Sequence, residues 1–220
     1  MGRIRTFYAS MVGKKVVMGV TGLIGIGFVI LHSLGNLLIF QGSAALNSYS
    51  HFLKSSAELL WALRVVLLVA VTLHVIAAVQ LTRQSRAARP IGYVKHETHV
   101  ATIASRTMRW GGALFLVFII VHILHFTTGT IRPAGVFSRE DVYANVVSSF
   151  RIWWVALFYV VSMIALGFHL FHGAWSSVRS IGASPPSPQP MHRKVSLVIA
   201  VLVWVAFTAV PVAVFAGWVR

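Results

Sequence analysis

The chain has 220 residues, of which 57% are hydrophobic and only 10% are charged. A soluble domain of this size needs more charged side chains to cover its surface, so the composition indicates an integral membrane protein. The absence of cysteine excludes disulfides, thiolate-bound iron–sulfur clusters and haem attached through C-x-x-C-H. The net charge of +15 is typical of basic cytoplasmic loops that hold topology or contact an acidic partner, and we expect no nucleic-acid partner.

Five long apolar runs predict an all-α membrane protein with five transmembrane helices in a single domain. About 20 apolar residues at 1.5 Å per residue cross a hydrocarbon layer of about 30 Å. Continuous runs favour helices over barrel strands, whose residues alternate in polarity. The first run is too long for a signal peptide, and no small-residue cleavage site follows it. The predicted spans within residues 1–220 are 16–40, 59–82, 110–128, 152–175 and 195–218.

Lysine and arginine are divided unevenly between the two ends of the predicted bundle. The N-terminal segment, the second loop and the fourth loop hold thirteen of them, and the opposite side holds six. By the positive-inside rule, the N-terminus is cytoplasmic and the C-terminus is outside. We therefore expect a multi-pass protein of a bacterial or archaeal-type cytoplasmic membrane. Residues 183–190, ASPPSPQP, contain too much proline for a helix and predict a short extended linker.

Six of the ten histidines lie inside the predicted spans, at least one on each of the first four. Ionisable side chains are costly at membrane depth and usually face the bundle interior, where they bind something. Because successive spans run in opposite directions, these histidines fall at two levels, each supplied by two helices. The outer level has His32 with His122 or His125, and the inner level has His74 with His169 or His172. The other four, which we expect in solvated loops, are His51, His96, His99 and His192.

Two imidazoles that face one another across a bundle are the ligands of a six-coordinate b-type haem, which carries electrons rather than binding oxygen. Two levels therefore predict two haems. Zinc would need three or four converging ligands, and the two levels are separated by much of the bilayer. A proton or ion pathway through the histidines stays open. Spacing does not choose within either H-x-x-H pair, because residues three apart differ by about 4.5 Å in depth and share a helix face.

Small and basic residues near these histidines are candidates for contacting haem. Small residues let a porphyrin or another helix approach the backbone, and Asn36 is a candidate to orient a ligand. The packing candidates are Gly35, Asn36 and Gly173. A snorkelling membrane anchor is the alternative for each basic candidate. The propionate candidates are Lys14, Lys15, Arg106, Arg109 and Arg179 on the inner side, and Arg64 and Arg151 on the outer side.

Several segments resemble one family of membrane cytochromes. The elements H-x-x-G-N, A-R-P-x-x-Y and F-H-x-x-H-G are similar to those of the diheme cytochrome b membrane anchor of succinate:quinone oxidoreductases, the b558 type of succinate dehydrogenase and fumarate reductase. The resemblance covers most of the chain and leaves the last span generic. It lies in residues 22–54, 73–93, 105–126 and 168–182.

The resemblance implies a flavoprotein subunit and an iron–sulfur subunit on the cytoplasmic face. The basic loops 83–109 and 176–194 are candidates to dock these subunits, with holding the topology as the alternative. The resemblance also implies electron transfer through two b haems to a membrane quinone, expected to be menaquinone rather than ubiquinone. It makes His122 and His172 the ligands rather than His125 and His169, and leaves a higher oligomer of the complex open. Some members carry a glutamate two residues before the helix-four ligand for proton movement, where this chain has Leu170.

Quinone reduction takes two electrons and two protons, so a quinone site needs a redox centre and a proton route. Two other functions stay open. A haem b subunit of a hydrogenase, formate dehydrogenase or nitrate reductase would share the histidines, and a haem-free transporter would share only the helices. The quinone-site candidates are Ser105 and Arg106 on the inner side, and Asn47, Tyr49, His51 and Glu58 on the outer side.

Overall fold

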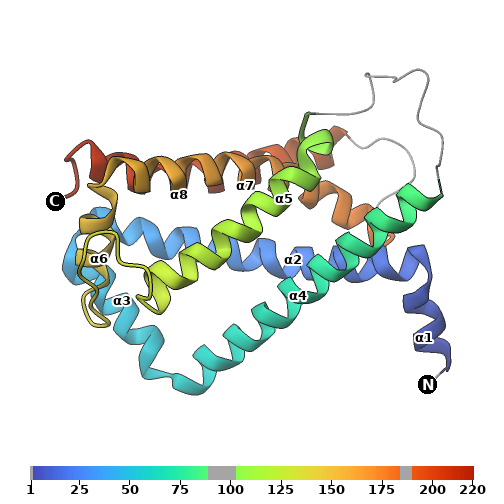
Figure 1. Ribbon diagram of the computed structural model, residues 1–220, viewed down its shortest axis with the longest axis horizontal. Helices are drawn as coiled ribbons and strands as arrows, with labels where there is room; N and C mark the ends of the chain where they lie inside the picture. The colour runs from blue at the N-terminus through green and yellow to red at the C-terminus, as the bar shows by residue number, and fades with distance from the viewer. Residues whose placement is uncertain (1, 89–102, 184–189) are drawn as a thin grey trace.

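The computed structural model describes residues 2–88, 103–183 and 190–220, and these residues form helices and connecting turns without any strand (Figure 1). The predicted all-α class is therefore confirmed. The helices are α1 (Gly2–Ala9), α2 (Met11–Asn36), η1 (Leu37–Gln41), α3 (Ser43–Ser55), α4 (Ala57–Ala87), α5 (Ile103–His122), η2 (Ile123–Thr127), α6 (Val142–Phe150), α7 (Trp153–Ser180) and α8 (Pro190–Phe215).

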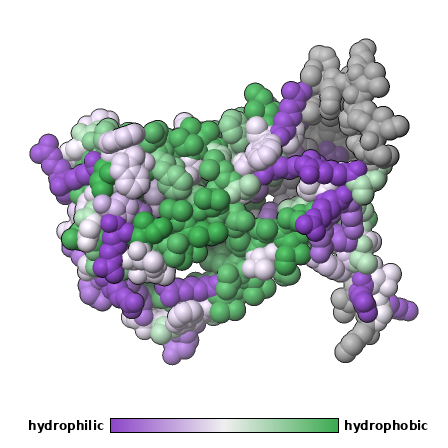
Figure 2. Space-filling view, viewed as in Figure 1, coloured by the Kyte–Doolittle hydropathy of each residue, from purple (hydrophilic) through white to green (hydrophobic). Residues whose placement is uncertain are grey.

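Five of these helical stretches are long and apolar enough to cross a membrane, as predicted. They cover Met11–Gln41, Ala57–Ala87, Ile103–Thr127, Trp153–Ser180 and Met191–Phe215. Several extend beyond the predicted limits, because hydropathy marks only the apolar part of a helix whose hydrogen bonds continue into polar residues such as Arg83 and Arg86. Figure 2 shows a broad hydrophobic band between hydrophilic ends, which is the surface that a bilayer requires.

Helix α7 is the centre of the bundle, since it packs against α2, α5 and α8, whereas α4 packs mainly on α2. Within the most apolar window of each helix, 39% of α7 is buried but only 11% of α4 and of α5. The core beside α7 includes Tyr159, Met163, Leu166 and Leu170. Figure 1 places α3 and α6 together at the end that holds the C-terminus, and α1 at the opposite end.

The short helices α3 and α6 were not predicted, because each is too short to show as an apolar span. Gly42, with φ of 97°, turns the chain into α3. Asp141 caps the start of α6 by accepting a hydrogen bond from the Ala144 amide at 2.9 Å. Two histidines expected in loops are therefore helical, since His51 lies on α3 and His192 lies on α8.

The connections from α4 to α5 and from α7 to α8 are described only at their ends. Helix α7 ends at Ser180, Gly182 follows its C-cap with a φ of 79° that suits a residue without a side chain, and α8 begins at Pro190. Most of the predicted linker, residues 184–189, lies outside the described residues. So does the stretch 89–102, which includes Arg89, Lys95, His96 and His99 of the predicted docking loop.

Candidate functional site

The outer histidine level joins α2, α5 and α8. The rings of His32 and His122 lie edge to face, with their centroids 5.8 Å apart. His32 stacks on Phe28 of its own helix at 5.3 Å and lies 5.7 Å from Phe207 of α8. The structure thus brings together two of the histidines that the sequence placed at one depth.

Aromatic side chains surround His122. Its ring centroid lies 5.5 Å from that of Phe118, 5.8 Å from Phe126 and 6.1 Å from Tyr159. Its Nδ1 atom is buried without a hydrogen-bond partner. A buried imidazole nitrogen without a partner is costly in an apolar surrounding. The protein therefore gives the Nδ1 atom of His122 no hydrogen-bond partner.

His125 is held quite differently. The π-helical turn η2 inserts an extra residue into the end of α5, and His125 on this turn is 4% exposed. One ring nitrogen, Nδ1, lies 3.0 Å from the hydroxyl of Tyr159, and the other, Nε2, lies 2.9 Å from that of Ser149. Both nitrogens are engaged in hydrogen bonds, so His125 has none left for a metal.

The inner level pairs α4 with α7. The ring centroids of His74 and His169 are 6.1 Å apart. The His74 Nδ1–H points to two acceptors on α2, the Met18 carbonyl at 3.1 Å and the Thr21 hydroxyl at 3.2 Å. A hydrogen bond at Nδ1 fixes the tautomer and leaves the Nε2 lone pair for a metal. His169 keeps a buried Nδ1 without a partner.

Two glycines give these rings room. A Cβ atom built on Gly22 of α2 would lie 3.4 Å from Cε1 of His74, and one on Gly112 of α5 would lie 3.6 Å from Cε1 of His169. Each imidazole therefore lies directly over a helix backbone. Neither glycine was predicted as a site residue, although for Gly112 the paired glycines inside an apolar span, in RWGGALF, are a usable signal of close approach.

His172 does not join this pair. Its ring lies 5.5 Å from that of Trp175, and within the described residues no ring contact connects it to His74. Its Nδ1 is nevertheless buried and has no partner. The ligand favoured by the resemblance, His172, therefore stays a prediction, and the ring geometry favours its alternate, His169.

Both pairs have the ring spacing expected of two imidazoles that share one metal ion. Imidazoles that bind one metal ion from opposite faces, each through a bond of about 2 Å, have ring centroids about 6 Å apart. The observed 5.8 Å and 6.1 Å match this spacing. Among the described residues, no three His, Cys, Asp or Glu side chains converge as zinc would need. The histidines thus meet in twos, at two depths.

The packing candidates differ in surroundings. A Cβ on Gly35 would lie 2.6 Å from Cε1 of Tyr49, so Gly35 makes room for that ring, whereas nothing lies within 4 Å of a Cβ on Gly173. Asn36 is the last residue of α2 and makes no capping hydrogen bond to η1. Tyr49, an outer quinone candidate, thus packs on α2.

Among the propionate candidates, Lys14 stands apart because it is buried, with its ammonium donating to the Ala9 carbonyl at 2.6 Å. Arg64 lies over the Trp61 ring at 5.1 Å, as a membrane-edge anchor does. The exposed candidates are Lys15, Arg64, Arg106, Arg109, Arg151 and Arg179.

The quinone-site candidates lie at both ends of the bundle. Ser105 and Arg106 lie in the first turn of α5 at the inner end, and Glu58 lies exposed in the first turn of α4.

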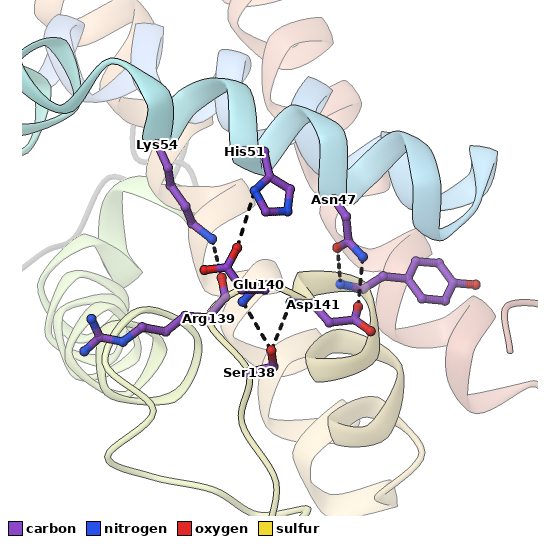
Figure 3. A network of polar contacts seen from close by, with 8 residues as sticks. Asn47, His51, Lys54, Ser138, Arg139, Glu140 and Asp141 are labelled. Atoms are coloured by element: carbon purple, nitrogen blue, oxygen red, sulfur yellow. Dashed lines mark hydrogen bonds and ion pairs between the residues drawn. The ribbon is translucent and has the colours of Figure 1, made fainter.

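The remaining outer quinone candidates belong to a polar network between α3 and the segment before α6 (Figure 3). Asn47 donates to Asp141 at 3.0 Å and accepts from the Tyr143 amide at 3.0 Å. His51 lies 3.4 Å from the Glu140 carboxylate. The Ala144 amide and the Asn47 side chain hold the pKa of Asp141 below its ordinary value. Asn47 and His51 thus tie α3 to α6, which is a structural role.

The amino-acid sequence of the chain is similar to that of one known membrane cytochrome. The chain is 26% identical over 193 residues to the succinate dehydrogenase cytochrome b558 subunit of Bacillus subtilis (strain 168), covering 86% of this chain and 88% of that protein. The chain is a distant homologue of that cytochrome b558 subunit. The match confirms the resemblance and extends over nearly the full length of both proteins. No protein-family model matches the chain, and no solved structure matches it.

Proposed function

We propose that this protein is the membrane anchor and electron-transfer subunit of a succinate dehydrogenase or fumarate reductase. The homology to a cytochrome b558 subunit supports the complex, and the two histidine pairs support the chemistry. The observation that carries the proposal is that two imidazoles meet at each of two depths in the bundle. A haem iron held by two imidazoles supplies one-electron transfer at each level.

This chain's own residues hold and enclose the two haems. His32 and His122 are the axial ligands at the outer level, and His74 and His169 are those at the inner level. The hydrogen bond of His74 to Met18 orients its ring, and Phe118 and Phe207 keep water from the outer level. We propose His169 in place of the expected His172, because the described residues show a ring contact of His74 with His169 and none with His172. Basic side chains at the membrane edges, with Lys14 the buried one, are the propionate candidates.

The partners are a flavoprotein subunit and an iron–sulfur subunit at the end that carries α1, the cytoplasmic face by the positive-inside rule. Succinate is oxidised in those subunits. The membrane quinone, menaquinone, exchanges two electrons and two protons with the complex. With His169 as the ligand, the position two residues earlier is Gly167, so neither choice supplies the glutamate that some diheme members use.

The test is haem and flavin content of the purified complex. We expect two b haems per chain by pyridine haemochrome, co-purified flavin, and haem that succinate reduces. Haem without co-purified flavin would favour a hydrogenase, formate dehydrogenase or nitrate reductase partner. An intact complex without any haem would overturn the electron-transfer role and turn the histidines into a proton or ion pathway.

A further inference from the structure

Tyr159 of α7 lies at the centre of an aromatic cluster beside the outer histidine pair. Its side chain is buried, and its ring centroid lies 6.1 Å from that of His122. Rings that are packed this closely have little freedom to turn, so the direction of the Tyr159 ring limits the directions open to His122. The other rings around it lie at centroid distances from 4.9 Å to 5.9 Å and belong to Phe118, His125, Phe126, Phe150 and Phe158.

Two hydrogen bonds in series hold the Tyr159 ring by its hydroxyl. This hydroxyl lies 3.0 Å from Nδ1 of His125, and Nε2 of the same imidazole lies 2.9 Å from the hydroxyl of Ser149 on α6. A neutral imidazole donates at one ring nitrogen and accepts at the other, so it can join two hydroxyls. His125 and Ser149 are buried, and hydrogen bonds away from water are stronger. The position of Tyr159 is therefore fixed against α6.

His125 also reaches the outer ligand through Phe126. The rings of His125 and Phe126 are stacked, with centroids 4.0 Å apart and an angle of 20° between their planes. Phe126 in turn lies 5.8 Å from His122, with its plane at 60°. The π-helical turn η2 carries both His125 and Phe126 directly after His122 at the end of α5. His125 therefore contacts two of the rings that lie against His122.

The quantity that this packing restrains is the angle between the two outer imidazoles. The ring planes of His32 and His122 are 80° apart, whereas those of His74 and His169 are 59° apart. The direction of an axial imidazole decides which iron d orbitals overlap with its π system, and axial ligands and their surroundings tune the potential of a haem. A restraint on the His122 ring is therefore a restraint on the electronic state of the iron that this ring binds.

We infer that His125 and Tyr159 position the outer haem ligand, holding the imidazole of His122 at its angle to that of His32. This inference rests on the proposed function, and it gives the second histidine of the outer H-x-x-H pair a role in electron transfer that does not require it to touch the metal. His125 is a positioning residue, because it acts on His122 through Tyr159 and Phe126.

Tyr159→Phe in the whole purified complex tests the hydroxyl, since it removes the bond to His125 and keeps the ring. Two haems per chain should remain. The EPR signal of the oxidised outer haem, identified as the one that His122→Ala lacks, should become broader, because a ring that takes several angles gives the iron several d-orbital splittings. The inner haem should keep its signal. Tyr143→Phe, which removes a hydroxyl bonded to the Arg220 carbonyl at 2.9 Å, is the matched control and should change neither signal.

The same variant should lower the reduction potential of the outer haem. Low-spin iron has a vacancy in these d orbitals only when it is oxidised, so a ring that is free to turn stabilises the oxidised state. We expect the one-electron equilibrium to change about threefold towards oxidised iron, a shift of about 30 mV at about 59 mV per tenfold change. A redox titration of both haems measures it, with the inner haem as the internal reference.

Ser149 tests the far end of the hydrogen-bonded series. Ser149→Ala removes the hydroxyl that holds His125 and should broaden the signal of the outer haem as Tyr159→Phe does. Ser149→Thr keeps a hydroxyl and should retain the signal of the unchanged complex. Ser148→Ala is the control on the same helix, because its hydroxyl bonds to the Ala144 carbonyl at 2.7 Å.

An outer haem with unchanged signal and potential in both Tyr159→Phe and Ser149→Ala would overturn the inference and leave these bonds a purely structural role. Equal changes at both haems would also overturn it, because they would report a general loosening of the bundle. So would loss of the outer haem from Tyr159→Phe, since a group that only orients the ligand is not needed to hold the haem. Failure of the proposed function is distinct, because the unchanged complex would then lack haem or contain haem that succinate does not reduce.

Discussion

The two H-x-x-H pairs have the same spacing but opposite surroundings. In the outer pair, the second histidine, His125, is 4% exposed and both of its ring nitrogens are hydrogen-bonded. In the inner pair, the second histidine, His172, has a buried nitrogen without a partner and its ring lies 5.5 Å from that of Trp175. The second histidine is thus held by hydrogen bonds at the outer level, whereas the Nδ1 atom of its counterpart has none at the inner level.

The difference teaches that spacing identifies a histidine pair but not the role of each member. At the outer level the first histidine is the ligand candidate and the second supports the packing of α6 and α7. At the inner level the first histidine pairs with His74, and the second lies against Trp175 outside that pair. This contrast sets the order of the following predictions.

The largest effect should come from removing a ligand. His122→Ala and His169→Ala should each lower haem from two per chain to one, because an axial imidazole cannot be replaced by methyl. The measurement is pyridine haemochrome on the purified complex, with His125→Ala and His172→Ala as controls that keep both haems. Two haems in His169→Ala and one in His172→Ala would return the inner ligand to His172, as the resemblance implied.

The second effect concerns stability. His125→Ala removes two hydrogen bonds and leaves the hydroxyls of Ser149 and Tyr159 buried without partners, at a cost of about 2–5 kcal/mol. His172→Leu leaves no protein group unpaired and should change stability by less than about 1 kcal/mol. Thermal unfolding of the two complexes at one scan rate compares them. If His172→Leu lowered the thermal stability as much as His125→Ala, the contrast between the two histidine pairs would be contradicted.

The third effect is a difference in stability between alanine substitutions at Gly35 and Gly173, the two glycines of the sequence motifs. Gly35→Ala places a Cβ 2.6 Å from the Tyr49 ring, and the overpacking should cost about 1–3 kcal/mol. Gly173→Ala meets nothing within 4 Å and should be neutral or stabilising by up to about 1 kcal/mol. Melting temperature and haem content check both variants. Haem loss in Gly173→Ala would mean that a porphyrin lies against that backbone.

The smallest effect is the pH dependence of stability that Asp141 contributes from the polar network outside the spans. The pKa of Asp141 is lowered in the folded protein by the Ala144 amide and the Asn47 side chain. Its carboxylate therefore stabilises the fold above about pH 4, and this contribution is lost as the pH falls through the lowered pKa. Asp141→Asn keeps a capping acceptor and should remove that pH dependence. Melting curves of both proteins between about pH 3 and pH 6 test this, and parallel curves would exclude a role for Asp141.

The sequence by itself determined the membrane class, the five spans and the two histidine levels. Each follows from one-dimensional quantities: apolar length against bilayer thickness, and residue position along helices that alternate in direction. The motifs that resemble the b558 family also predicted the distant homology that the near-full-length match confirms. The short helices α3 and α6 were not predicted from the sequence. They are stabilised by caps and by contacts such as that of Asn47 with Asp141, and neither has a long apolar run that would mark it.

Only the tertiary structure decided which histidine of each pair meets its partner. His122 and His125, like His169 and His172, share a helix face and differ by about one turn, so their spacing carries no information about their neighbours. The π-helical turn at η2 and the hydroxyls of Tyr159 and Ser149 engage His125, and Gly112 lets His169 lie against α5. These contacts come from residues far apart in the chain, because packing between helices, not local sequence, sets the direction and partners of each ring.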